Sequence, residues 1–240
     1  VVKWDPTEPS NWRATSDLQD WMRRRGRIGM GGVDSRRLTR AIRQQGSPHV
    51  VLAHDPDGKF DIEAMIATAR DWKGLVGLDL AREVTTRQSY HWEGGLWSWP
   101  GEFAPQSEPQ PFKVVALDYG AKRNILRSLV SVGADVTVLP ATATAEDVLA
   151  HAPEGAFLSN GPGDPEATGE YAVPMIKALL ESDVPIFGIC LGHQMLALAL
   201  GAKTVKMGHG HHGANHPVRD IDSGKVEITS MNHGFAVEAQ

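Results

Sequence analysis

The residue with the clearest capacity for covalent chemistry is Cys190, the single cysteine among 240 residues. It stands in GICLGHQ (188–194), after the apolar run VPIFGI (184–189) and before the helical pattern LGHQMLALALG (191–201). Two glycines flanking the residue at a strand-to-helix junction form the thiol counterpart of the elbow that displays a catalytic serine. Partial positive charge at a helix start favours a thiolate, and the Leu191 N–H can face a developing oxyanion. The pattern favours a nucleophile at Cys190.

A glycine loop, SNGPGDP (159–165), follows the predicted strand that precedes the Cys190 strand in the chain. Gly161 and Gly163 on either side of a proline make a stiff turn that presents backbone N–H groups, and Asp164-Pro165 suits a helix start. In open α/β sheets ligands bind beyond the carboxyl ends of the strands. We therefore expect this loop to form an oxyanion and substrate wall beside the thiol, with an ordinary strand-to-helix loop as the alternative.

Other arrangements of reactive side chains are weaker. Free cysteines are commonly buried and inert, which is the alternative for Cys190. A dyad of Cys190 with His193 is disfavoured because the two side chains point in different directions: the thiol points up from the helix start, whereas His193 turns along the side of the helix. The tract GHGHHGANH (208–216) suggests a metal site, yet it has no second ligand group at a recognisable spacing, so we expect no physiological metal. The histidines of that tract are His209, His211, His212 and His216.

Regular alternation in the second half of the chain predicts the elements that position these residues. Its strands are continuous apolar runs, which are typical of a parallel sheet covered by helices on both faces. We predict strands at 113–117, 135–139, 155–158 and 184–189, and helices at 121–133, 144–152, 171–182 and 191–201. Successive units of this kind predict a doubly wound, mostly parallel α/β sheet. Beyond Gly201 we expect strands at 203–207, 225–230 and 235–239, joined by loops.

The first half of the chain indicates a separate, smaller α/β domain. Short apolar runs at 28–30 and 49–55 are strand candidates, and helices are expected at 15–27, 34–46 and 61–72. A stretch rich in proline, glycine and tryptophan, WEGGLWSWPGEFAPQSEPQPF (92–112), has no helical or alternating period. We therefore predict a partial amino-terminal domain at 1–91, a linker at 92–112 that lies against a domain surface through its aromatic rings, and a second partial domain at 113–240.

Composition narrows the class of protein. A net charge of −5 and a sequence pI near 6.1 leave no basic surface for nucleic acid or anionic lipid. The apolar runs are too short to span a bilayer, so we expect no membrane partner. A single cysteine allows no internal disulfide, which fits a reducing compartment and predicts a cytoplasmic location.

Longer stretches of the sequence resemble a known family. SNGPGDP, PIFGICLGHQMLALALGAKTVKM, GHHGANHPV and NHGFAV occur in the order and spacing of the class I glutamine amidotransferases. Together with GGVDSRRLTR, GLVGLDLAREVTT and LDYGAKRNILR, they resemble the small, glutaminase subunit of carbamoyl-phosphate synthetase. The resemblance implies hydrolysis of L-glutamine through a Cys190 thioester. It also implies transfer of the ammonia to a separate large subunit, which uses ATP, magnesium and bicarbonate, for pyrimidine and arginine biosynthesis. No cofactor is expected in this subunit.

Residue by residue, the resemblance also implies a set of glutamine contacts. Asn232 and the backbone around Gly234 would hold the α-amino and α-carboxylate groups, and the glycine loop and the helix start would serve the carboxamide. The implied contacts are Gly161, Gly163, Leu191, Gln194, Asn232, Gly234 and Phe235.

One part of the family pattern is missing from the sequence. The family's catalytic histidine and glutamate lie in a His-Pro-Glu segment, whereas His216-Pro217 is followed here by Val218. We therefore expect a chain shortened at both ends, with little glutaminase activity of its own. The alternatives are a non-catalytic glutamine-binding or regulatory subunit, the glutaminase of another amidotransferase serving anthranilate or guanylate synthesis, and, more distantly, a cysteine hydrolase of peptides.

Overall fold

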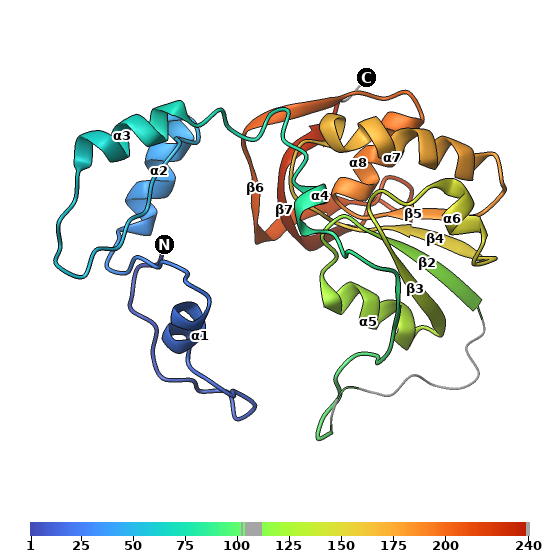
Figure 1. Cartoon of the computed structure of the whole chain (residues 1–240), viewed down its shortest axis with the longest axis horizontal. Coiled ribbons are helices and arrows are strands. Elements are labelled where there is room, and N and C mark those ends of the chain that lie inside the picture. Colours follow the sequence, from blue (N-terminus) through green and yellow to red (C-terminus); the bar gives the residue numbers. More distant parts are fainter. Residues whose placement is uncertain (102, 104–111, 239–240) are drawn as a thin grey trace. The chain divides into compact units, whose positions relative to one another are not determined.

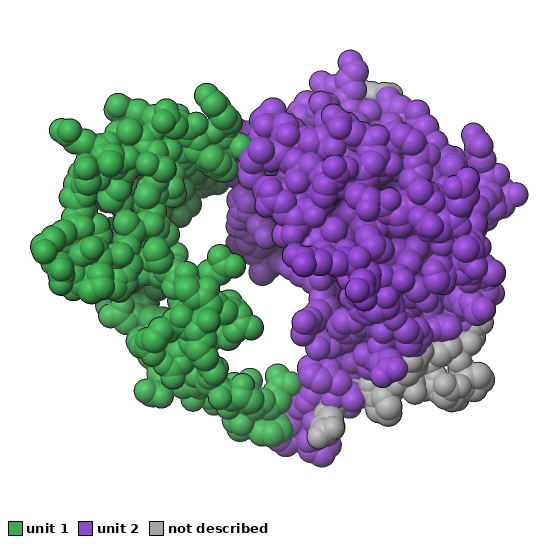
Figure 2. Space-filling view, in the orientation of Figure 1, with its two compact units in different colours: residues 1–74 green, residues 75–240 purple. Residues whose placement is uncertain are grey.

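The computed structural model describes residues 1–101, 103 and 112–238, and it consists of two compact units (Figures 1 and 2). The first unit is Val1–Gly74 and the second is Leu75–Gln240. The division falls earlier than the predicted boundary after residue 91, because residues 75–91 pack on the second unit. In the described residues no helix is both long and apolar enough to cross a membrane.

Residues 1–74 form three short helices, α1 (Leu18–Arg24), α2 (Ser35–Gln45) and α3 (Ile62–Asp71). An aspartate caps the N-terminus of each, accepting a backbone N–H from the first turn. All of these residues are described and none of them is buried, so the unit has no core of its own.

The strands expected at 28–30 and 49–55 are absent, which corrects the prediction of a small α/β domain. Apolar side chains such as Ile28 and Val50 are exposed there. Val2 does make two backbone hydrogen bonds, donating to Met30 and accepting from Val33, but they do not extend into a ladder. A short apolar run becomes a strand only where a partner strand pairs with it, and residues 1–74 provide none.

The second unit is built on a five-stranded sheet in the order β1-β3-β2-β4-β5. Strands β2, β3, β4 and β5 run parallel to one another, and β1 pairs antiparallel with β3 at one edge. The strand bounds are β1 Tyr90–Trp92, β2 Phe112–Asp118, β3 Ala134–Pro140, β4 Gly155–Leu158 and β5 Ile186–Gly188. The four parallel strands match the predicted apolar runs.

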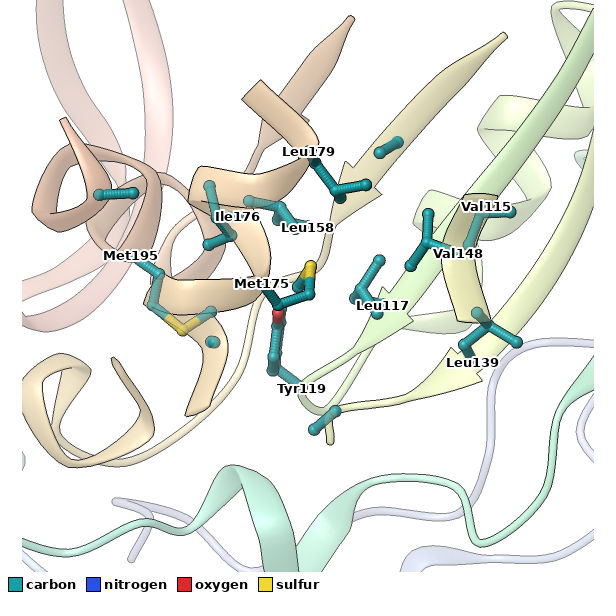
Figure 3. Packing of buried hydrophobic residues seen from close by; sticks show 14 of the residues in the cluster. Val115, Leu117, Tyr119, Leu139, Val148, Leu158, Met175, Ile176, Leu179 and Met195 are labelled. Atoms are coloured by element: carbon teal, nitrogen blue, oxygen red, sulfur yellow. The ribbon is translucent and has the colours of Figure 1, made fainter. Parts of the chain in front are cut away.

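Helices cover both faces of this sheet, which confirms the doubly wound architecture (Figure 1). Helix α5 (Arg123–Ser131) packs on one face, where Leu126 and Val130 meet Val136 and Phe157. The other face carries α6 (Ala145–Leu149), α7 (Pro165–Leu180) and α8 (Leu191–Ala199). Figure 3 shows the core between these helices and the sheet, which includes Val115, Leu117, Tyr119, Leu139, Val148, Leu158, Met175, Ile176, Leu179 and Met195.

The segment 75–91 belongs to the second unit through partly buried polar contacts. Its short helix α4 (Ala81–Val84) begins with a fully buried alanine. Just before that helix, Asp79 accepts hydrogen bonds from Thr168 at 3.1 Å and Tyr171 at 3.2 Å, both on α7. Thr86 donates its backbone N–H to Asp118 at the end of β2, at 2.7 Å. These bonds join residues far apart in the chain, and local patterns do not reveal them.

The predicted linker, 92–112, begins as the end of β1 and then runs along α5. The Leu96 N–H donates to Ser131 Oγ at 2.8 Å, and the Arg127 guanidinium lies 4.0 Å from the centre of the Phe103 ring. Residues 102 and 104–111 lie outside the described residues.

The chain after α8 forms a long antiparallel hairpin of β6 (Thr204–Arg219) and β7 (Val226–Val237). The predicted strands at 203–207 and 225–230 fall mainly inside this hairpin. Of the third predicted strand, 235–239, residues 235–237 belong to β7, residue 238 lies beyond it, and residue 239 is outside the described residues. The histidine tract, predicted as a loop, is part of β6. Its register against β7 shifts between Lys206 and His211 and between Gly213 and His216. Two irregularities in one strand explain why the sequence lacked a period there.

Candidate active site

Cys190 stands at a sharp turn between β5 and α8 with a left-handed backbone, φ +54° and ψ −109°. The two flanking glycines are required by crowding. A Cβ on Gly188 would lie 2.6 Å from the Gly192 carbonyl carbon, and one on Gly192 would lie 2.1 Å from the Leu158 carbonyl oxygen. The strand and the helix therefore approach more closely than any side chain permits, as the elbow pattern predicts. The strained backbone at Cys190 is typical of a functional position.

Helix α8 starts at Leu191, so the N–H of this residue has no acceptor within the helix. The Leu191 side chain is buried against the core, which fixes the direction of the first turn. Cys190 itself is half-buried. This combination presents a thiol and a backbone donor from adjacent residues on a rigid support.

The glycine loop lies against this helix start. A Cβ on Gly161 would be 2.1 Å from the Tyr119 carbonyl oxygen and 2.9 Å from Leu191 Cδ2, so only glycine fits. The Gly192 N–H donates to the Ser159 carbonyl oxygen at 3.1 Å, which ties the loop to the elbow directly. The structure thus brings Gly161 and Leu191 together, as expected from their strands meeting at one edge of the sheet.

Gly163 faces the opposite side of the loop. It has φ +99°, and a Cβ there would lie 2.7 Å from the Leu78 carbonyl oxygen. Next to it, the buried Asp164 accepts the Gly77 N–H at 2.8 Å through Oδ2 and caps α7 by accepting from the Glu166 N–H. The segment 75–91 therefore supports the glycine loop on its Gly163 side. This support was not predicted, because no local sequence pattern joins residues 77 and 164.

Asn160 fixes the front of the loop. Its amide nitrogen donates to the Gly120 carbonyl oxygen at 3.0 Å, and its amide oxygen accepts the Lys122 N–H at 3.1 Å. No role was predicted for Asn160, although its place two residues after the end of β4 was a usable signal.

The hairpin brings the third group of predicted residues to the elbow. Cys190 Sγ lies 3.9 Å from the Asn232 carbonyl oxygen. Gln194, one turn further along α8, donates its amide nitrogen to the Phe235 carbonyl oxygen at 2.7 Å, and both residues are buried. Gly234 lies between Asn232 and Phe235 on β7 and faces Lys206 across the hairpin. Gln194, expected to touch substrate, therefore also joins α8 to β7.

Histidines near the elbow are arranged differently from a catalytic dyad. His193 is exposed on α8, and the hydrogen-bond contact of Cys190 Sγ is with a carbonyl oxygen. On the hairpin, His211 Nδ1 lies 3.2 Å from His233 Nε2, and His212 Nδ1 lies 2.7 Å from Asn232 Oδ1. In the part of the chain that the structure describes, no three His, Cys, Asp or Glu side chains form a group able to hold a metal ion. His233 was not predicted as a site residue, although it stands between two predicted contacts, Asn232 and Gly234.

Two family models match the chain. Residues 115–240, more than half of the sequence, match the class I glutamine amidotransferases. Residues 1–52 match the CPSase domain of the carbamoyl-phosphate synthase small chain. Among solved structures, a glutamine amidotransferase from Thermotoga maritima aligns with a TM-score of 0.43 at 18% identity, over 53% of this chain and 62% of that one.

Relatives named carbamoyl phosphate synthase small chain match almost the whole sequence. The protein from Ruegeria pomeroyi is 71% identical over 100% of this chain, and that from Caulobacter vibrioides is 61% identical over 97%. The protein from Brucella anthropi is 62% identical over 100% of this chain. The chain spans 62%, 60% and 58% of the lengths of these three relatives. The elbow, the glycine loop and the family match agree: the chain belongs to the class I glutamine amidotransferases.

Proposed function

We propose that the protein containing this chain is the glutaminase subunit of a carbamoyl phosphate synthase, with Cys190 as its nucleophile. The observation that carries the proposal is the strained elbow at Cys190, whose next residue, Leu191, starts helix α8 and packs against Gly161. A nucleophile next to fixed backbone donors suits acyl transfer from a carboxamide. The names of the relatives and the match of residues 1–52 support the choice of synthase.

In the proposed reaction, the Cys190 thiolate attacks the side-chain carboxamide carbon of L-glutamine. The carbonyl oxygen becomes an oxyanion, which the Leu191 N–H at the start of α8 and the backbone of the adjacent Gly161 loop would stabilise. Cleavage of the C–N bond releases ammonia and leaves a γ-glutamyl thioester, which water hydrolyses to glutamate and free thiol. The leaving nitrogen needs a proton, and we expect its donor in the His-Pro-Glu segment of the family, which this sequence does not contain.

The hairpin would recognise the other end of the substrate. Asn232, Gly234 and Phe235 lie on the β7 stretch that contacts Cys190 and Gln194. Polar groups of this stretch suit the α-amino and α-carboxylate groups, which leaves the carboxamide facing the elbow.

The proposal includes the biological setting. Ammonia would pass to a large subunit that uses ATP, magnesium and bicarbonate, in a cytoplasmic heterodimer serving pyrimidine and arginine biosynthesis. No cofactor is assigned to this subunit.

The test uses the full-length protein together with its large subunit. Cys190→Ser should abolish glutamine-dependent synthesis of carbamoyl phosphate and leave ammonia-dependent synthesis intact. Retention of glutamine-dependent synthesis in this variant would refute the assignment of Cys190.

A second candidate concerns residues 1–240 on their own. Because Cys190 Sγ contacts a carbonyl oxygen and the sequence has no His-Pro-Glu segment, we propose that the isolated chain binds glutamine without turning it over. Calorimetry would detect the binding, and a coupled ammonia assay would report any turnover. Turnover near that of the full-length protein would overturn this second proposal.

A further inference from the structure

We propose that His211 is a positioning residue for the glutamine site and acts through His233. The two residues face each other directly in the register of β6 and β7. His211 Nδ1 lies 3.2 Å from His233 Nε2, with the rings 5.0 Å apart and nearly perpendicular, at 81°. This inference rests on the proposed function, because it concerns the strand that would hold the substrate.

The acceptor of the other His233 nitrogen determines where the protons of the His211–His233 pair lie. His233 Nδ1 lies 2.8 Å from the Phe235 carbonyl oxygen, which can only accept, so Nδ1 must carry a proton. In neutral His233 the other nitrogen, Nε2, is then an acceptor. His211 Nδ1 must supply the proton between the rings. The tautomer of His233 is thus held from both sides: the Phe235 carbonyl oxygen requires the proton on Nδ1, and the His211 donor requires Nε2 to stay unprotonated.

The Phe235 carbonyl oxygen is where this chain of bonds meets helix α8. It accepts from His233 Nδ1 at 2.8 Å and from Gln194 Nε2 at 2.7 Å, which fills both of its lone pairs. Three residues earlier, the Asn232 carbonyl oxygen contacts Cys190 Sγ. A change of tautomer at His233 would remove one of the two donors to Phe235 and loosen residues 232–235 against the elbow.

The surroundings of His211 keep it neutral and suited to donate. Desolvation, followed by the neighbouring imidazoles, lowers the pKa of His211 below its ordinary value. The ring of His216 lies 5.1 Å from that of His211. The irregularity of β6 between Lys206 and His211 sets this register, in line with the use of bulges to re-aim side chains next to active sites. The rings of His233 and His216 contact that of His211, and the charges of His209 and His212 act on it more weakly.

The experiment compares three substitutions in the full-length protein with its large subunit. His211→Asn places an amide donor near the former Nδ1, His211→Gln places it near the former Nε2, and His211→Leu removes it. His209→Leu, an exposed histidine of the same strand, is the matched control. The readouts are KM and kcat for glutamine and the ¹⁵N ring shifts of His233, which report its tautomer.

We expect His211→Leu and His211→Gln to raise the KM for glutamine by about tenfold, the equivalent of one lost hydrogen bond. The kcat should change much less, and His233 should show mixed tautomers. His211→Asn should keep KM near the unsubstituted value and retain the proton on His233 Nδ1. Because Asn and Gln are both polar and differ by one methylene, their comparison decides the question even where the leucine variant does not fold.

Three results would overturn the proposal: an unchanged His233 tautomer in His211→Gln, an equal rise of KM in the Asn and Gln variants, or the same rise in His209→Leu. Failure of the proposed function is distinguishable from these. An unsubstituted protein that does not hydrolyse glutamine would refute that function, whereas the ring shifts of His233 would still test the link to His211.

Discussion

The two sides of the candidate site are held in different ways. On the nucleophile side, Gly161, Gly188 and Gly192 have no room for a Cβ, and Leu191 is buried in the core. The hairpin side consists mostly of exposed residues and joins α8 through the Gln194–Phe235 bond and the contact of Asn232 with Cys190. Close packing therefore holds the proposed nucleophile, while a few polar contacts hold the proposed substrate-binding strand. Substitutions on the first side should therefore affect folding, and those on the second should affect binding.

Gly192→Ala should have the largest effect. Its Cβ would meet the backbone of Leu158, which cannot rotate away, so α8 has to move off β4. We expect the free energy of unfolding to fall by roughly 3 kcal/mol or more. Gly208→Ala on the hairpin, where a Cβ meets nothing within 4 Å, should change it by less than about 0.5 kcal/mol. Urea denaturation of the full-length protein measures both, and equal losses would contradict the comparison.

Gln194→Leu tests the joint between the two sides. It removes the donor to the Phe235 carbonyl oxygen from a buried position, and we expect a loss of roughly 1–3 kcal/mol in stability. Hydrogen exchange should rise along 232–235 but stay low in β4. His193→Leu, at the exposed neighbouring position, is the control and should leave exchange unchanged. A rise spread evenly over both strands would argue that the two sides are not separable.

Cys190→Gly should be more stable than Cys190→Ala, although both variants lose the reactive thiol. A non-glycine residue at φ +54° and ψ −109° is strained, and glycine relieves that strain, which we expect to raise stability by about 1 kcal/mol over Cys190→Ala. Thermal unfolding of the two variants gives the difference. If Cys190→Gly is less stable than Cys190→Ala, the backbone is not strained in the way described.

Tyr119→Phe should have the smallest effect. The Tyr119 hydroxyl is fully buried and has no hydrogen-bond partner among the residues that the structure describes, and this burial raises its pKa well above the ordinary value (Figure 3). Removing it should leave stability unchanged or raise it by at most about 1 kcal/mol. Tyr171→Phe is the matched control, because it loses the bond to Asp79 and should be destabilised by about 1 kcal/mol. Equal losses in the two variants would indicate a partner for Tyr119.

The contrast between the closely packed elbow and the hairpin also explains which features the sequence could predict. The elbow and the glycine loop were predictable because GICLG and SNGPGDP encode close backbone approach within a few residues. The parallel strands were predictable from continuous apolar runs. The strands expected at 28–30 and 49–55 were wrong because pairing depends on a partner that local pattern cannot supply. The glycine and histidine content of 208–216 concealed a strand, since its register shifts break any alternation.

Long-range polar contacts were the other feature that could not be predicted from the sequence. Asp164 binds Gly77, and Asp118 binds Thr86, so the segment 75–91 packs with the second unit rather than the first. Gln194 was expected as a substrate contact, but the partner of its amide nitrogen, Phe235, lies 41 positions away. Such bonds depend on the folded topology and leave no periodic signal.

The central claim is that Cys190 forms a covalent intermediate with the side chain of glutamine. The most direct measurement mixes the full-length protein with isotope-labelled glutamine, quenches it in acid, and locates the label by mass spectrometry of peptides. We predict a labelled γ-glutamyl group on the peptide that contains Cys190, absent from Cys190→Ser. Continued hydrolysis of glutamine with no label at Cys190 would contradict the account.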